Sequence, residues 1–174
     1  YGAHIWGDFD APYIDVSAGN RMACCDTFRI TVEGSSTHGS TPHLGTDAIV
    51  AAASIIMNIQ TYVSRNNDPL NPLVVTVGKI DGGQRFNILA NKVVMEGTCR
   101  TFSRKTLETI DKDLERIAAN TAAAFGASAS LEYQHLTTPA INDHEDLNRI
   151  ARNAVIKLYG EEGLGHLPTM MGSE

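Results

Sequence analysis

The chain has 174 residues, of which 43% are hydrophobic and 20% are charged, a composition typical of an ordinary globular domain. Its formal net charge of -6 argues against a nucleic-acid-binding protein, which normally presents a basic face. No apolar run is long enough to cross a membrane. The cysteines Cys24, Cys25 and Cys99 lack a disulfide or metal-binding spacing, so we expect reduced thiols and a cytoplasmic protein. Because the first residue is not Met, we expect the chain to be part of a longer protein.

The first third of the chain predicts short extended pieces, then a strand and a helix. Residues 1–25 are broken by Gly and Pro, whereas residues 26–34 alternate apolar and polar side chains as a half-buried strand does. A turn around His38 follows. A helix should begin at Thr46 or Asp47, since either can cap it, and should end before the next Asn-Asn-Asp-Pro. Its predicted inward stripe consists of Ile49, Ala52, Ile56, Ile59 and Val63.

The rest of the chain predicts two further strands, a helix, a strand and a last helix. Residues 73–80 and 92–102 are rich in β-branched side chains and are separated by a Gly-containing turn. Residues 106–125 have the period of one long helix, which Gly126 should end, and residues 127–136 should form a fourth strand. A third helix is expected at residues 145–159, followed by an irregular tail.

The order of elements from residue 26 to residue 136 is therefore β-α-β-β-α-β. Right-handed crossovers fold this order into a ferredoxin-like α+β unit, in which a four-stranded antiparallel sheet carries both helices on one face. We expect residues 1–25 and 137–174 to be flanking pieces outside this unit.

Several short motifs together resemble a known family, the dinuclear-metal amidohydrolases that include bacterial aminoacylases, hippurate hydrolases and plant auxin-conjugate hydrolases. Each motif alone is weak, but their order and spacing agree over nearly the whole chain. In chain order they are His4-Ile5-Trp6, His38 with Pro42 and Asp47, Val74 to Ile80, Phe86-Asn87-Ile88, Gly97 to Phe102, and Met171-Gly172-Ser173-Glu174.

The resemblance implies an enzyme built from a catalytic α/β domain and an inserted domain. The catalytic domain would hold two divalent metal ions (zinc, manganese or similar), and residues 1–25 and 137–174 would be its flanks. Residues 26–136 would be the inserted domain, which serves as a lid and forms a homodimer. The complete enzyme would cleave the amide bond of an N-acyl amino acid or similar conjugate. Since this chain keeps at most one metal ligand, we expect it to bind no metal stably and to be inactive alone.

The resemblance assigns a catalytic role to His38 and a metal-ligand role to His4. His38 would reach the active site of the partner subunit, polarise the scissile carbonyl and stabilise its oxyanion. The plainer alternative is a turn histidine that bonds the backbone. For His4 the alternative, which we favour in this chain, is a frayed terminal histidine.

Two further residues would contact the substrate. Arg100 would clamp the free carboxylate of the substrate in bidentate fashion, or it would instead form an ion pair across the sheet with Glu96 or Glu33. Asn87 would donate to the same carboxylate or to the oxyanion, or it would be a loop amide bonded to its own backbone.

Two other classes of protein share the predicted fold. A non-catalytic β-α-β-β-α-β module that binds a small molecule explains the fold equally well, but it does not explain the combined His38, Asn87 and Arg100 motifs. An RNA-binding sheet domain does not fit, because the chain is acidic and its central strands lack an exposed aromatic pair. We therefore expect neither nucleic acid nor membrane as a partner.

Overall fold

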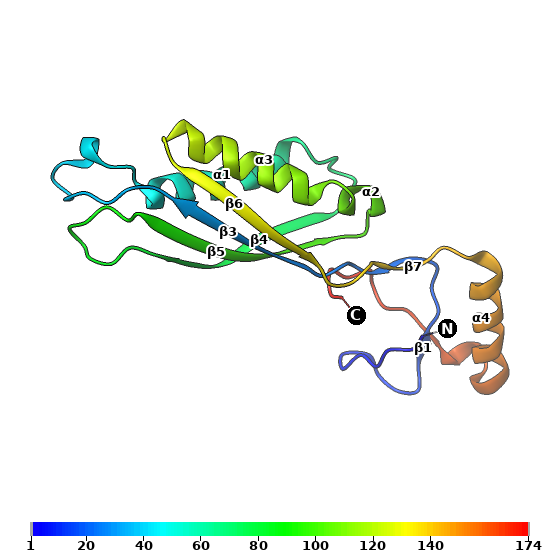
Figure 1. Cartoon of the computed structure of the whole chain (residues 1–174). Coiled ribbons are helices and arrows are strands. Elements are labelled where there is room, and N and C mark those ends of the chain that lie inside the picture. Colours follow the sequence, from blue (N-terminus) through cyan, green and yellow to red (C-terminus); the bar gives the residue numbers. More distant parts are fainter. Residues whose placement is uncertain (1, 174) are drawn as a thin grey trace.

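The computed structural model describes residues 2–173 as an elongated molecule with two units (Figure 1). The larger unit is a four-stranded sheet with helices on one face, and the smaller unit gathers both ends of the chain. The larger unit contains β3 (Asp26–Glu33), α1 (Ala48–Arg65), β4 (Leu73–Gly82), β5 (Lys92–Thr101), α2 (Arg104–Leu107), α3 (Ile110–Ala124) and β6 (Ser128–His135).

The strand order in the large sheet is β4-β5-β3-β6, and every neighbouring pair is antiparallel. Both crossovers place their helices on the same face, with α1 over β4 and β5 and with α3 over β6 (Figure 1). This arrangement confirms the α+β fold that the sequence predicts, a four-stranded antiparallel sheet with its helices on one side.

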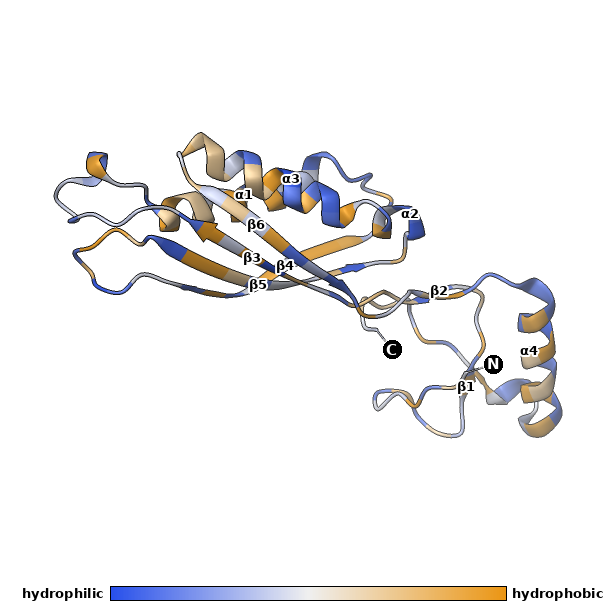
Figure 2. Ribbon diagram, viewed as in Figure 1, coloured by the Kyte–Doolittle hydropathy of each residue, from blue (hydrophilic) through white to orange (hydrophobic). Residues whose placement is uncertain are grey.

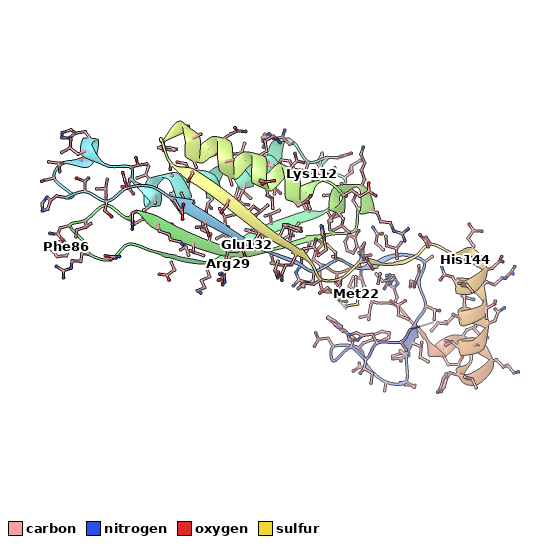
Figure 3. The ribbon with its side chains drawn as sticks, viewed as in Figure 1. Met22, Arg29, Phe86, Lys112, Glu132 and His144 are labelled. Carbon is pink, nitrogen blue, oxygen red and sulfur yellow. The ribbon has the colours of Figure 1, made fainter. Side chains whose placement is uncertain are left out.

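The core lies between the sheet and the helices, because alternate side chains of each strand point to that face. Phe28, Ile30 and Val32 of β3 are buried there, and Figure 2 shows apolar colouring along the strands beneath the helices. The opposite face has no helix and is polar. Arg29 and Glu132 project from it (Figure 3), and Arg29 Nη2 lies 2.8 Å from Glu96 Oε1.

Two helix predictions need correction. In α1 the buried stripe is Ala48, Ala51, Ala52, Ile55 and Ile59, so Ile49, which was predicted to face inward, is 46% exposed. Apolar residues surround the first turns of this helix, and the sequence pattern therefore did not fix its rotation. The predicted helix 106–125 is wrong as a single element, since Ser103 caps the short α2 and Thr109 starts α3 anew. Gly126, at φ +73°, ends α3 as predicted.

The smaller unit joins residues from the two ends of the chain. The strand β1 (Ile14–Asp15) pairs in parallel with β8 (Leu164–Gly165), and β2 (Gly19–Met22) pairs antiparallel with β7 (Ala140–Asn142). Arg21 forms an ion pair with Asp15 and also donates to the Leu167 carbonyl. The hydrogen bond to Leu167 ties this N-terminal pair to the C-terminal segment. The helix α4 (Glu145–Tyr159) has the predicted bounds. The strand β8 lies in the tail that was expected to be irregular, and β7 lies before α4 in a segment for which no strand was predicted. The division into domains at residues 25 and 137 remains a prediction.

Candidate functional site

The His38 turn is closed at its base by a backbone bridge and held at its tip by short hydrogen bonds. Ser35 and Thr46 exchange two backbone hydrogen bonds of 3.0 Å, which return the chain to the start of α1. Asp47 then caps that helix by accepting from the backbone N–H groups of Ile49 and Val50. At the tip, the Thr41 backbone N–H donates to the His38 carbonyl over 2.9 Å. The exposed imidazole is therefore carried on a constrained turn.

Hydrogen bonds at the His38 ring indicate which nitrogen carries the proton. The Ser40 backbone N–H donates to Nδ1 over 3.2 Å, and Ser40 Oγ lies 2.7 Å from the same atom. Since an amide N–H can only donate, Nδ1 must accept, and a neutral ring then carries its proton on Nε2. No described side chain hydrogen-bonds to Nε2. The backbone hydrogen bond expected of a simple turn histidine is therefore present at Nδ1. It leaves the Nε2–H group of His38 available as a donor.

Asn87 lies beside His38 because backbone hydrogen bonds join the two loops at the end of the sheet. His38 and Ile88 form an antiparallel bridge, the Gly39 N–H donates to the Asn87 carbonyl over 2.8 Å, and the Leu89 N–H donates to the Thr37 carbonyl. A Cβ on residue 39 would lie 3.2 Å from the Asn87 oxygen, so a glycine suits this close approach. The side-chain amide of Asn87 makes no hydrogen bond within the described residues, its own backbone included.

Arg100 lies at the opposite end of the sheet, where the larger unit meets the smaller one. Its side chain is on the helix-free face, and Nη1 donates to Ser173 Oγ over 3.1 Å and to the Met171 carbonyl over 3.3 Å. The alternative ion pair with Glu96 is not formed, because Glu96 pairs instead with Arg29 and with Lys79. The guanidinium therefore faces the segment that ends in Glu174, which itself lies outside the described residues.

The four sequence-predicted residues fall into separate places. His38 and Asn87 share the far end of the larger unit, which is also the end at which β5 begins with Lys92. Arg100 lies eight residues further along β5. Eight strand residues span about 26 Å, so Arg100 and the His38 turn of one chain are too far apart to contact one small substrate. His4 lies in the smaller unit with its ring centroid 5.7 Å from that of Trp6.

The described residues do not fit a dinuclear metal site. No group of three or more His, Cys, Asp or Glu side chains between residues 2 and 173 is arranged to hold a metal ion. His4 is thus brought near no ligand set within this part of the chain, and these residues by themselves cannot hold a pair of metal ions.

Sequence reasoning missed two features near the candidate site. Phe86 belongs to the Phe86-Asn87-Ile88 motif, but its complete exposure at the tip of the larger unit was not predicted (Figure 3). The exposure of Phe86 could have been predicted from its position in a Gly-rich turn, outside any apolar period. Ser40, which fixes the His38 tautomer, carried no signal beyond its small size.

A buried polar cluster underlies the Arg100 end of the sheet. The fully buried Asp26 accepts from Tyr133 Oη over 2.9 Å, contacts His135 Nδ1 at 2.9 Å and accepts from the Leu136 N–H. Burial raises the pKa of the neighbouring Cys99 thiol to about 12 and also raises the pKa of Tyr133. Both groups therefore stay protonated at neutral pH, which makes Cys99 a structural residue and not a nucleophile.

Comparison with known proteins identifies the family of this chain. Residues 25–125 match the family described as the peptidase dimerisation domain of the M20 type. The chain belongs to this family. An N-acyl-L-amino acid amidohydrolase from Geobacillus stearothermophilus is 35% identical over 98% of this chain and 46% of its own length. An N-acetyl-L-cysteine deacetylase from Bacillus subtilis is 34% identical over 90% of this chain and 37% of its own length.

A solved structure shows the same fold in a larger protein. It is a Bacillus subtilis protein described as a dinuclear metal binding peptidase of the M20 family, with a TM-score of 0.74 and 27% identity over 97% of this chain and 41% of that one. The chain with this M20 dimerisation domain thus spans less than half the length of these three relatives. No helix among residues 2–173 is long and apolar enough to cross a membrane.

Proposed function

We propose that this chain supplies the dimerisation domain and the substrate-contacting loops of a metal-dependent amidohydrolase, which cleaves the amide bond of N-acyl amino acids or similar conjugates. The named activities of the relatives support the reaction class, and the description of the Bacillus subtilis structure supports two metal ions in the complete protein. Those ions would supply the activated water, in a part of the enzyme that the described residues do not provide. We further propose that the chain is cytoplasmic and inactive by itself.

The observation that carries this proposal is the position of His38 and Asn87 on two joined loops, about 26 Å from Arg100. In a two-fold dimer these loops would reach the Arg100 end of the other copy. The His38 Nε2–H and the Asn87 amide would then donate to the developing oxyanion and to the substrate carboxylate, while Arg100 of the second copy would hold that carboxylate. Each active site would need residues from both subunits.

Mixed dimers of the full-length enzyme test this arrangement. His38→Ala and Arg100→Ala should each abolish turnover of an N-acyl amino acid while the dimer persists. Co-expressed in equal amounts, the two variants should recover about a quarter of wild-type activity, because half of the random dimers would contain one site with both residues intact. If His38 acted within its own subunit, the mixture would stay inactive. Asn87→Ala mixed with Arg100→Ala should show the same recovery, and Asn87→Ala mixed with His38→Ala should show none.

A further inference from the structure

The hydrogen bonds of Arg100 occupy one nitrogen of its guanidinium and leave the other two nitrogens open. Nη1, which carries two hydrogens, donates to Ser173 Oγ over 3.1 Å and to the Met171 carbonyl over 3.3 Å. Nε and Nη2 have no hydrogen-bond partner among residues 2–173, and no carboxylate in that part of the chain forms an ion pair with Arg100. A guanidinium can hold a carboxylate end-on, through Nη1 and Nη2, or side-on, through Nε and Nη2. With Nη1 occupied, the side-on edge is the one that remains.

The segment that supplies both acceptors is itself held by backbone hydrogen bonds. The Ala23 N–H donates to the Gly172 carbonyl over 2.8 Å, immediately before Ser173 in the sequence. Two residues earlier, the Met170 N–H donates to the Arg21 carbonyl over 3.3 Å. The hydroxyl and the carbonyl that meet Arg100 are therefore carried on a backbone that is anchored beside the chain entering β3.

The same entering chain is also bonded to the end of β5. The Cys24 N–H donates to the Thr101 carbonyl over 3.0 Å, next to Arg100 in the sequence. Three segments that lie far apart in the sequence therefore meet at this point, and Figure 1 shows the C-terminal segment at the junction of the larger and smaller units. The guanidinium comes from the larger unit, whereas the acceptors at Nη1 come from the C-terminal segment.

We propose that Ser173 is a positioning residue for Arg100, which presents its Nε–H and Nη2–H edge to the carboxylate of the substrate. This inference rests on the proposed function, which assigns that carboxylate to Arg100. Arginine has a long side chain with many rotamers, and a free guanidinium would lose this freedom when it binds. Because Ser173 holds Nη1 before the substrate arrives, part of this entropy loss occurs on folding instead, and the open edge is already aligned for two parallel hydrogen bonds.

The side-on edge also defines which substrates the site should accept. Two parallel N–H donors match the two acceptor oxygens of a carboxylate. A carboxamide offers one acceptor oxygen and an NH₂ group, which would face a second donor. We therefore expect a strong preference for substrates with a free carboxylate over their amides, and Ser173 should contribute to this preference.

Kinetics of the full-length enzyme test the role of Ser173. Ser173→Ala removes the hydroxyl and keeps the backbone bonds of the segment, so it should raise the KM for an N-acyl amino acid roughly tenfold. Its kcat should stay within about twofold, because the lost interaction holds the bound substrate and its transition state equally. Ser173→Thr keeps the hydroxyl and should retain the wild-type KM. Ser64→Ala is the matched control, since the Ser64 hydroxyl donates only to the Thr61 carbonyl within α1.

A substrate without the carboxylate separates positioning from a general structural role. The carboxamide of the same N-acyl amino acid lacks the anion that Arg100 recognises. Ser173→Ala should therefore lower kcat/KM for the acid roughly tenfold and leave kcat/KM for the amide unchanged. An equal loss on both substrates would mean that Ser173 only supports the fold, and it would overturn the positioning role.

A double variant tests whether Ser173 acts through Arg100. Arg100→Lys keeps the positive charge but removes the guanidinium fork, and it should raise the KM by itself. With no fork left to align, adding Ser173→Ala to Arg100→Lys should change the KM by less than about twofold. Losses that multiply in the double variant would mean that Ser173 acts independently of Arg100, which contradicts the inference.

The same variants separate this inference from the proposed function. A raised KM in Arg100→Lys together with a wild-type KM in Ser173→Ala would overturn the positioning role alone and leave the carboxylate clamp intact. A wild-type KM in both variants would overturn the clamp assigned to Arg100 and, with it, this inference.

Discussion

Replacing Gly34 by Ala should open the His38 turn without unfolding the larger unit. A Cβ at residue 34 would lie 2.3 Å from the Thr46 carbonyl oxygen and 3.1 Å from its carbon. These are backbone atoms that cannot rotate away, and the oxygen is the acceptor of the Ser35 N–H. Relieving the clash would break both hydrogen bonds between Ser35 and Thr46. At about 1 kcal/mol for each bond, the loss is about 2 kcal/mol.

The measurement combines thermal unfolding with hydrogen exchange on the isolated chain. A destabilisation of that size should lower the Tm by roughly 4 to 8 °C in a chain of this length, and the Ser35 and Thr46 amides should lose protection before those of β3 and β5. In the full-length enzyme the displaced His38 should reduce turnover on the order of 100-fold. Gly78→Ala is the matched control, since no atom lies within 4 Å of the added Cβ, and its effect should stay within about 0.5 kcal/mol. Unchanged protection of both amides in Gly34→Ala would refute the reasoning.

Three other predictions concern stability and titration. Asp47→Ala removes the cap of α1 and should cost about 1 kcal/mol in urea unfolding, whereas Asp68→Ala, outside any helix, should cost clearly less. Asp26→Ala leaves the buried Tyr133 hydroxyl without its acceptor and should lower the free energy of unfolding by about 3 kcal/mol. A second change, Tyr133→Phe, should restore part of this loss. Strictly additive losses in the double variant would contradict the coupling between the two residues. Burial raises the pKa of the Cys99 thiol to about 12 from 9.0, so the contribution of this group to stability is complete below pH 9 and declines as the pH rises toward 12. For the same reason the Cys99 thiol should resist a disulfide reagent at pH 9 until the chain unfolds.

The local sequence determined most of the larger unit. Alternation fixed β3 and the two faces of β5, Asp47 and Gly126 marked helix ends through capping chemistry, and the order of elements left one compact topology. Where apolar residues surround a helix, as in the first turns of α1, periodicity could not fix which side is buried. The break between α2 and α3 lies at Glu108 and Thr109, and the helical period of residues 106–125 gave no indication of it.

The sequence motifs also provided the identities of His38, Asn87 and Arg100, but only the tertiary structure decided which of them lie together. The Gly39 and Asn87 backbones meet through a bridge between loops about fifty residues apart, and no local pattern encodes that contact. The same holds for Arg21 and Asp15, which tie the two ends of the chain together through Leu167. Local propensity acts over a few residues, whereas the separation of Arg100 from His38 is set by the length of β5 and by the direction in which the strands pair.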